Sequence, residues 1–204
     1  MAKMGRRPSI TRDRIISAGI AVTMPRLHVR AVAQELGVSE MSIYRHVKNL
    51  EGLRRMVAEG ICERAEFAEP QSSDPKEGLL EHARYLRSFL REYPGIAEYL
   101  LQIAPTSRHI LSMMDAHHQA CAKAYGWDLG IASVVISAVS RYVVTLSVLE
   151  DRNLKVRPND VPLLDQSEFP ALGAGVIVGA TLGDPLEYTV KALIEGLLQD
   201  FGLK

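Results

Sequence analysis

A short segment, residues 39–48, combines side chains that donate and accept hydrogen bonds with cationic ones. Its short polar groups come first and its larger groups follow, in the order Ser39, Glu40, Ser42, Tyr44, Arg45, His46 and Lys48. Short polar groups suit the edges of bases, and the larger hydrogen-bonding groups suit phosphate oxygens. Met41 also faces outward in this pattern. The segment is therefore predicted to contact nucleic acid.

Two short helices around a tight turn would present this segment. The first helix has an apolar face made of Val29, Val32, Ala33 and Leu36. Gly37 can adopt the positive φ that ends a helix, and Ser39 is a good N-cap for a second helix that turns Ile43 and Val47 inward. In a helix-turn-helix the second helix lies in the major groove. The pattern predicts this reader, and the alternative is an ordinary helical hairpin.

The charge of the chain is distributed unevenly. The whole sequence has 24 Lys or Arg and 24 Asp or Glu, which by itself argues against a nucleic-acid partner. Residues 1–64, however, contain 12 Lys or Arg against 6 Asp or Glu. A basic first third joined to an acidic remainder is expected if only the first third touches phosphates.

Composition and cysteine usage indicate a soluble protein in a reducing compartment. Cys62 and Cys121 are far apart and form no CxxC pair, so no disulfide framework or zinc site is predicted, and a cytoplasmic location is expected. Residues 129–149 are apolar enough to suggest a membrane span, but Arg141 lies in the middle of the run. A charge there is costly in lipid, so we expect a buried helix and no membrane partner.

The periodicity along the chain is helical throughout, which predicts an all-α protein. We expect a helix-turn-helix DNA-binding domain with a basic arm at residues 1–50, a connecting helix at 51–69 that stops before Pro70, and a helical effector-binding and dimerisation domain at 76–204. Thr11 and Asn49 are predicted caps in the first domain. Residues 152–169 are polar and proline-bearing and are predicted to form a loop, and residues 170–180 have no clear form.

The last helix is predicted to start at Asp184-Pro185 and has more apolar positions than a lone surface helix needs. A C2 homodimer that joins this helix and the 129–149 helix to their copies would bury both stripes. The same dimer would supply the two readers that a palindromic operator requires.

With these features, the sequence resembles the tetracycline-repressor (TetR) family of transcriptional regulators. The resemblance rests on GRRPSITRDRIISAGIAV, the helix-turn-helix and YRHVKNLEGL, and more weakly on LREYPGIAEYLLQIAPT and VSRYVVTLSVLED. It implies a homodimer, a DNA-binding head, an effector pocket in the larger domain, and release from DNA when the pocket fills.

The resemblance also assigns roles to positions in the head. Positions implied to read bases are Arg30, Glu40, Met41, Ser42 and Arg45, and those implied to contact phosphates are Tyr44, His46 and Lys48. His28 departs from the usual capping Thr or Ser, and Leu50 from a Lys that often meets phosphate. Arg6 and Arg7 form either an arm that enters the minor groove or a solvated tail.

The pocket side is less defined, with candidates His82, Leu86, Met113, His117 and Arg141. Arg141 is either half of a structural ion pair or the anchor of an acidic effector. His117 and His118 are adjacent in a helix, so they are not expected to face one site and are predicted to be surface or hydrogen-bonded residues.

No metal site, cofactor or catalytic residue is predicted. In the register of the tetracycline repressor, Leu100 replaces a metal-binding His, although Glu150 matches an acidic residue of that site. The leading hypothesis is therefore a repressor that binds a palindromic operator as a dimer and is released by an unknown small-molecule effector. The alternatives are an effector-independent regulator or activator and, with no HExxH, GxSxG or P-loop to support it, a helical-bundle enzyme.

Overall fold

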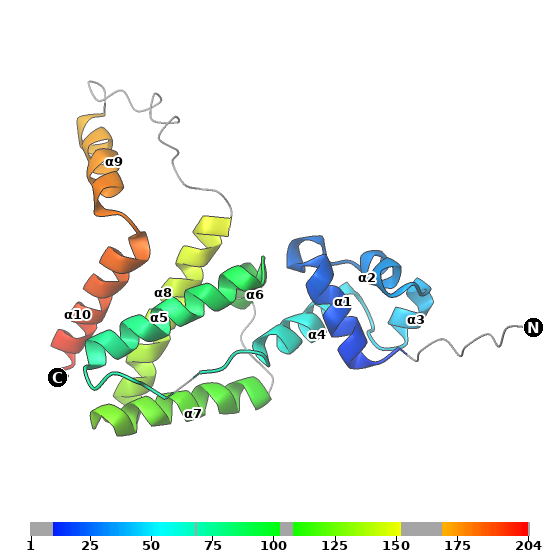
Figure 1. The fold of residues 1–204 in the computed structure, drawn as a ribbon, viewed down its shortest axis with the longest axis horizontal. Helices are drawn as coiled ribbons and strands as arrows, with labels where there is room; N and C mark the ends of the chain where they lie inside the picture. Colours follow the sequence, from blue (N-terminus) through cyan, green and yellow to red (C-terminus); the bar gives the residue numbers. More distant parts are fainter. Residues whose placement is uncertain (1–9, 68, 103–107, 152–168, 204) are drawn as a thin grey trace, which may run out of the picture.

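The computed structural model describes residues 10–67, 69–102, 108–151 and 169–203, and these residues form helices joined by turns, as predicted for an all-α protein (Figure 1). The elements are α1 Arg12–Val22, η1 Met24–Arg26, α2 Val29–Leu36, α3 Glu40–Tyr44, α4 Leu50–Cys62, α5 Pro75–Glu92, α6 Ile96–Gln102, α7 Arg108–Tyr125, α8 Leu129–Asp151, α9 Pro170–Leu182, η3 Leu186–Val190 and α10 Lys191–Asp200. We call α1–α4 the head and α5–α10 the body.

The head forms from the local signals in its sequence. The side chain of Thr11 accepts a hydrogen bond from the Arg14 amide and starts α1, and Asn49 accepts one from the Gly52 amide and starts α4. Gly37 ends α2 in the left-handed region at φ 65°. These three signals were predicted from the sequence, and the structure confirms them.

Glycines let α1 and α4 approach closely. A Cβ atom added at Gly19 would overlap the Val57 side chain, and one added at Gly60 would overlap Ile16. Val57 is fully buried, so the contact has no free space to absorb a methyl group. α1 also packs on α2, and α2 on α3, so α1 and α4 hold α2 and α3 in place.

The helices on either side of the turn at Val47 are shorter than predicted. α3 ends at Tyr44, and Val47 is nevertheless buried because the turn after α3 carries it inward. The connecting helix predicted to continue to just before Pro70 is wrong, because α4 ends at Cys62.

The early end of α4 has a local cause. The amides of Arg64 and Ala65 donate to carbonyls three residues earlier, which tightens the last turn. The amide of Glu66 then donates to the Tyr85 hydroxyl of α5 at 2.6 Å. A hydrogen-bond partner outside the helix thus replaces the carbonyl that a continuing helix would have used.

The body is organised around α8, which packs against α5, α6, α7 and α10. Among the described residues, the segment Leu129–Glu150 is the one helix long and apolar enough to cross a membrane by length and composition. Its inward side chains include Val135, Ile136, Val139 and Val143, each at most 1% exposed. These contacts make α8 the central helix of the body.

A buried ion-pair cluster ties α5 to the C-terminal part of the body. The Arg87 guanidinium pairs with both carboxylate oxygens of Glu150 and lies 2.5 Å from Asp184 Oδ2, while Arg91 lies 3.0 Å from Glu150. The side chain of Arg87 is 8% exposed and that of Glu150 is 10% exposed. Arg141 was predicted to need a partner for its charge within an apolar helix, but it is exposed on α8; among the described residues, Arg87 is the buried arginine.

The C-terminal segment lies on the side of the body farthest from the head (Figure 1). Residues 170–180, for which no clear form was predicted, belong to α9, and several of its apolar side chains are exposed: Leu172, Ile177, Val178 and Leu182. The last helix begins with the π-helical turn η3 and continues as α10. The predicted loop at 152–169 lies almost entirely outside the described residues.

Candidate nucleic-acid interface and internal cavity

The outward face of α3 carries the residues predicted to read bases and contact phosphates. Ile43 is fully buried and fixes the helix on the head, while Met41 is 67% exposed and Tyr44 is 45% exposed. The other exposed side chains of this face are Ser39, Glu40, Arg45, His46 and Lys48, and Arg30 is exposed at the start of α2. The predicted reader residues in the described part of the head are therefore exposed, except for the half-buried Ser42.

Two capping positions in the head differ from the expected chemistry. Ser39 occupies the N-cap position of α3, but its hydroxyl lies 2.9 Å from the hydroxyl of the half-buried Ser42 and makes no capping hydrogen bond. His28 precedes α2 without capping it, and its Nδ1 donates to the Arg26 carbonyl at 2.7 Å. Ser39 and Ser42 are thus paired with each other at the start of the reader helix.

Two other predictions in the head have different outcomes. Arg6 and Arg7, the predicted basic arm, lie outside the described residues. Leu50 is the first residue of α4 and is 37% exposed. A leucine side chain at this position has no group that donates a hydrogen bond to a phosphate.

The body contains an apolar cavity of about 180 Å³, which we call the inner cavity. It lies between α5, α6, α7 and α8 and also touches the end of α4. Its lining residues are Cys62, Ala65, Phe67, His82, Leu86, Phe89, Leu100, Ile110, Met113, Met114, His117, His118, Ile136, Ser140 and Val144. Four of the five predicted pocket residues are among them. Arg141 does not line this cavity, so its predicted place in the pocket is wrong.

Two histidines of this cavity, His82 and His118, are hydrogen-bonded, and burial favours their neutral form. His82 Nε2 lies 2.8 Å from the Ser140 hydroxyl, and His118 Nδ1 lies 3.1 Å from the Ser133 hydroxyl. Burial, assisted by the neighbouring His117 and His118, lowers the pKa of His82 to about 3. Burial also lowers the pKa of His118. These side chains therefore offer uncharged hydrogen-bonding groups to the cavity.

His117 and His118 both line the inner cavity, contrary to the expectation that adjacent helical residues would not share a site. The ring centroids are 6.3 Å apart, with the planes inclined by 57°. The site lies over the edge of α7, so side chains that leave the helix in directions about 100° apart can both reach it. The prediction of hydrogen bonding holds for His118, and the prediction of separate surroundings does not.

Several lining residues were missed by the sequence reasoning. Ile136, Ser140 and Val144 are four residues apart on α8 and make one wall of the cavity. That spacing was visible as a helical stripe with a serine inside it, and it could have singled out Ser140. Phe67 was predicted to lie on a helix that continues to residue 69, but α4 ends at Cys62. Helical spacing therefore could not place its side chain in the cavity.

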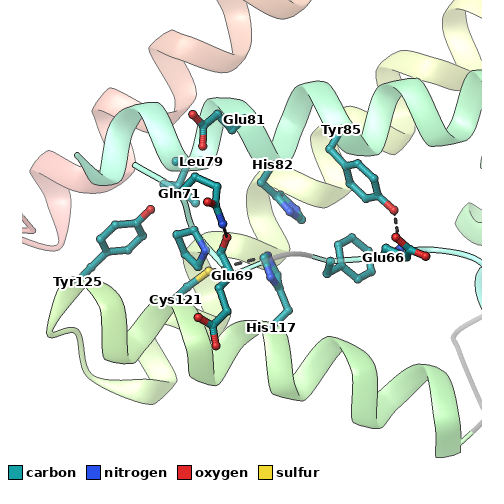
Figure 2. Close-up of a pocket in the computed structure, with 13 residues that line it drawn as sticks. Glu66, Glu69, Gln71, Leu79, Glu81, His82, Tyr85, His117, Cys121 and Tyr125 are labelled. Carbon is teal, nitrogen blue, oxygen red and sulfur yellow. Dashed lines mark hydrogen bonds between the residues drawn. The ribbon is translucent and has the colours of Figure 1, made fainter. Parts of the chain in front are cut away.

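A second cavity, of about 150 Å³, adjoins the first and is the outer cavity (Figure 2). It lies between α5, α7 and the segment that follows α4, and its walls include Gln71, Leu79, Tyr85, Cys121 and Tyr125. Burial raises the pKa of the Cys121 thiol to about 11, so the thiol stays protonated and is a poor nucleophile. Phe67, His82 and His117 line both cavities.

The residues that resembled part of a metal site do not assemble one. Leu100 is a wall of the inner cavity, and both oxygens of Glu150 are engaged by Arg87 and Arg91. Within the part of the chain that the structure describes, no group of three or more His, Cys, Asp or Glu side chains is placed to hold a metal ion. Glu150 thus serves the ion-pair cluster.

No protein-family profile matches the chain, and no curated protein sequence matches it. Several solved structures, by contrast, do match the chain. Apo ActR from Streptomyces coelicolor superposes with a TM-score of 0.77 at 21% identity, covering 97% of this chain and 99% of ActR. ActR, described as a TetR family protein, has also been crystallised with actinorhodin.

Two further structures resemble the chain. A variant of TetR from Acinetobacter baumannii AYE in complex with minocycline has a TM-score of 0.65 at 21% identity, covering 94% of this chain and 98% of that one. BioQ with its natural double-stranded DNA operator has a TM-score of 0.62 at 20% identity, covering 92% and 98%. At these identities the likeness establishes the architecture. The chain therefore has the fold of the TetR-family regulators that its sequence resembles.

Proposed function

We propose that this protein is a ligand-responsive transcriptional regulator of the TetR family, acting as a repressor in the cytoplasm. It binds a palindromic operator as a homodimer and leaves it when a small molecule occupies the inner cavity. The observation that carries the proposal is the combination of an exposed polar face on α3 in a basic head with an apolar cavity in the body that touches the end of α4. The ligand and DNA complexes of ActR and BioQ are consistent with both halves of the proposal.

The cavity has two routes to the head. The first is α4, whose last residue Cys62 lines the cavity together with Phe67. The second is α6, which contributes Leu100 to the cavity and packs against α4. A ligand that pushes on either wall therefore displaces α4, which belongs to the head, or α6, which packs against it.

A close contact at the start of α6 strengthens the second route. Gly95 has φ 84°, and a Cβ atom added there would lie 2.7 Å from Pro25 Cδ in the head. The Gly95 backbone thus lies directly against the Pro25 ring of the head, because glycine has no side chain of its own to separate them. The separation of the two heads in a dimer would follow such a shift.

The response needs only a modest difference in affinity. The effector must bind the DNA-free arrangement better than the DNA-bound one, and couplings of this kind are about 1–3 kcal/mol, or roughly 5–150-fold in affinity. A ligand bound in the uncharged cavity of the body can favour one head arrangement by this amount without contacting DNA.

The dimer we propose uses α8 and α10. Exposed apolar side chains on these elements include Leu129, Val134 and Leu149 of α8 and, directly after α10, Phe201. A C2 axis through this face would cover them and set the two reader helices side by side. The expected half-site spacing is about 34 Å or more.

The experiment that tests the proposal is selection of bound sequences from a random duplex pool by the full-length protein. A palindrome is expected, because two identical readers related by a C2 axis select inverted half-sites. Recovery of no enriched sequence would contradict the DNA-binding role.

Point variants then test the placement of the reader. Tyr44→Ala is expected to weaken binding to operator and scrambled duplexes alike, because its predicted contact is with phosphate. Arg45→Ala should cost about 1–3 kcal/mol mainly on the operator, because its predicted contact is with a base. Lys123→Ala removes an exposed cation from α7 and is the control that should change neither affinity. Titrations at two salt concentrations give both values, and unchanged binding by both head variants would refute the reader assignment.

A further inference from the structure

Three rings separate the inner cavity from the outer one. Phe67, His82 and His117 line both cavities, and they are the only residues that do so among those that line either one. We call them the ring partition. Figure 2 shows His82 on α5 and His117 on α7 pointing toward one another across the space between these helices.

The three rings of the partition contact one another, but they are held by different kinds of segment. The ring centroids of His82 and His117 lie 4.8 Å apart with the planes inclined by 21°, and Phe67 lies 5.7 Å from His82 and 5.2 Å from His117. Both histidines belong to long helices of the body. Phe67 belongs to the segment between α4 and α5, outside either helix. Phe67 is therefore the ring of the three that can move most easily.

Size separates the possible ligands. An apolar cavity of about 150 Å³ holds a benzene molecule, so each of the two cavities by itself admits little more than one six-membered ring. Sites for larger ligands measure about 300–1,000 Å³, and the two cavities joined reach the lower end of that range. Joining them requires the partition to open.

The charges of the residues that line the cavities further limit the class of ligand. The outer cavity is lined by the carboxylates Glu66, Glu69 and Glu81 and by no Lys or Arg, so it disfavours an anion. The lining residues of the inner cavity include no Asp, Glu, Lys or Arg, and burial lowers the pKa of His82 and of His118. An ion placed there would lose its hydration without gaining a counter-charge, which is strongly unfavourable. The Ser140 hydroxyl and the imidazole nitrogens can instead serve a neutral hydrogen-bonding group.

We propose that the effector is an uncharged, flat aromatic molecule of two or more rings that displaces Phe67 from the ring partition, stacks on His82 and His117, and occupies both cavities. The proposal rests on the proposed function, because the effector is what that function requires. Displacement of Phe67 also moves the segment that follows α4, which connects ligand entry to the head.

The test uses N-phenyl-1-naphthylamine, a neutral fluorescent probe with a flat bicyclic ring, on the full-length protein. Saturable binding of one probe per chain is expected. The Phe67→Ala variant should bind it about tenfold more tightly, because the probe no longer has to displace a ring that makes three aromatic contacts, with His82, Tyr85 and His117. If Phe67 were instead a fixed wall of the site, the same variant would bind the probe more weakly, and that result overturns the proposal.

Two comparisons make the result specific. Phe89→Ala opens a similar space in the wall of the inner cavity alone, so it should not tighten binding; equal tightening in both variants would mean that added volume is the cause and would refute displacement. 8-Anilino-1-naphthalenesulfonate carries the same rings with a sulfonate, and it should bind at least tenfold more weakly than the neutral probe in the Phe67-dependent mode. Comparable affinity of the two probes would overturn the assignment of an uncharged ligand.

Stability and DNA binding are measured in parallel. If Phe67→Ala does not fold, Phe67→Leu keeps an apolar side chain while removing the ring, and it should tighten probe binding in the same direction. Operator binding is measured without the probe. Failure of probe binding with intact operator binding refutes only the ligand class, whereas absence of operator binding refutes the proposed function independently.

Discussion

Replacement of Arg87 by methionine should destabilise the protein by about 3 kcal/mol. Removing one partner of a buried ion pair costs about 3–5 kcal/mol, because the remaining charge stays buried and uncompensated. Here Arg91 still lies 3.0 Å from Glu150, and the Asp184 side chain is 43% exposed and can regain water. Both features place the expected loss at the lower end of the range.

Thermal and denaturant unfolding at one fixed protein concentration measure this loss. In a chain of 204 residues, 1 kcal/mol shifts the Tm by about 2–4 °C, so the Arg87→Met variant should melt about 6–12 °C below the wild type. Protein concentration is held constant because dimerisation would contribute to the measured stability.

The matched control is Arg141→Met, which makes the same chemical change on the exposed side of α8. A surface substitution of this kind should change stability by no more than about 0.5 kcal/mol. A loss below 1 kcal/mol for Arg87→Met, or a larger loss for Arg141→Met than for Arg87→Met, would refute the assignment of Arg87 as the buried partner.

Three other predictions concern packing, DNA and pH. Gly19→Ala should destabilise the head by about 1 kcal/mol or more in urea unfolding, because its methyl group would overlap Val57, whereas Gly196→Ala, with open space around it, should be neutral or stabilising. Leu50→Lys should tighten binding to any duplex and raise the salt slope of the affinity by about 1, as titrations at several salt concentrations would show. The Arg87 guanidinium holds the pKa of the Asp184 carboxyl below its ordinary value, so the stabilisation that this pair gives is present above about pH 4 and is lost as the pH falls further. A pH series of unfolding free energies without such a drop would contradict this prediction.

The head could be predicted from sequence because its signals are local. Thr11, Gly37 and Asn49 begin and end helices through contacts within a few residues, and the inward positions Ile43 and Val47 repeat at helical spacing. The fold class followed from the same periodicity, and the resemblance to TetR-family regulators agrees with the fold that the structure has.

The site in the body was predicted less completely, because it depends on which helix faces come together. Of the predicted pocket residues, His82, Leu86, Met113 and His117 line one cavity, and Arg141 does not. An arginine in an apolar stretch gives no sign of whether it points inward, since the apolar residues around it include the exposed face of the same helix.

The sequence by itself determined the all-α class, the two short helices with their turn at Gly37, and the separation of a basic head from an acidic body, because these depend on residues close together in the chain. Only the tertiary structure decided where α4 ends, because the Glu66 amide finds its hydrogen-bond partner in Tyr85 of a different helix. The pairing of Arg87 with Glu150 and the stacking of Phe67 on His82 and His117 were decided in the same way. Contacts between residues distant in sequence depend on how helices pack, and helical periodicity indicates which face is apolar without identifying the face it will meet.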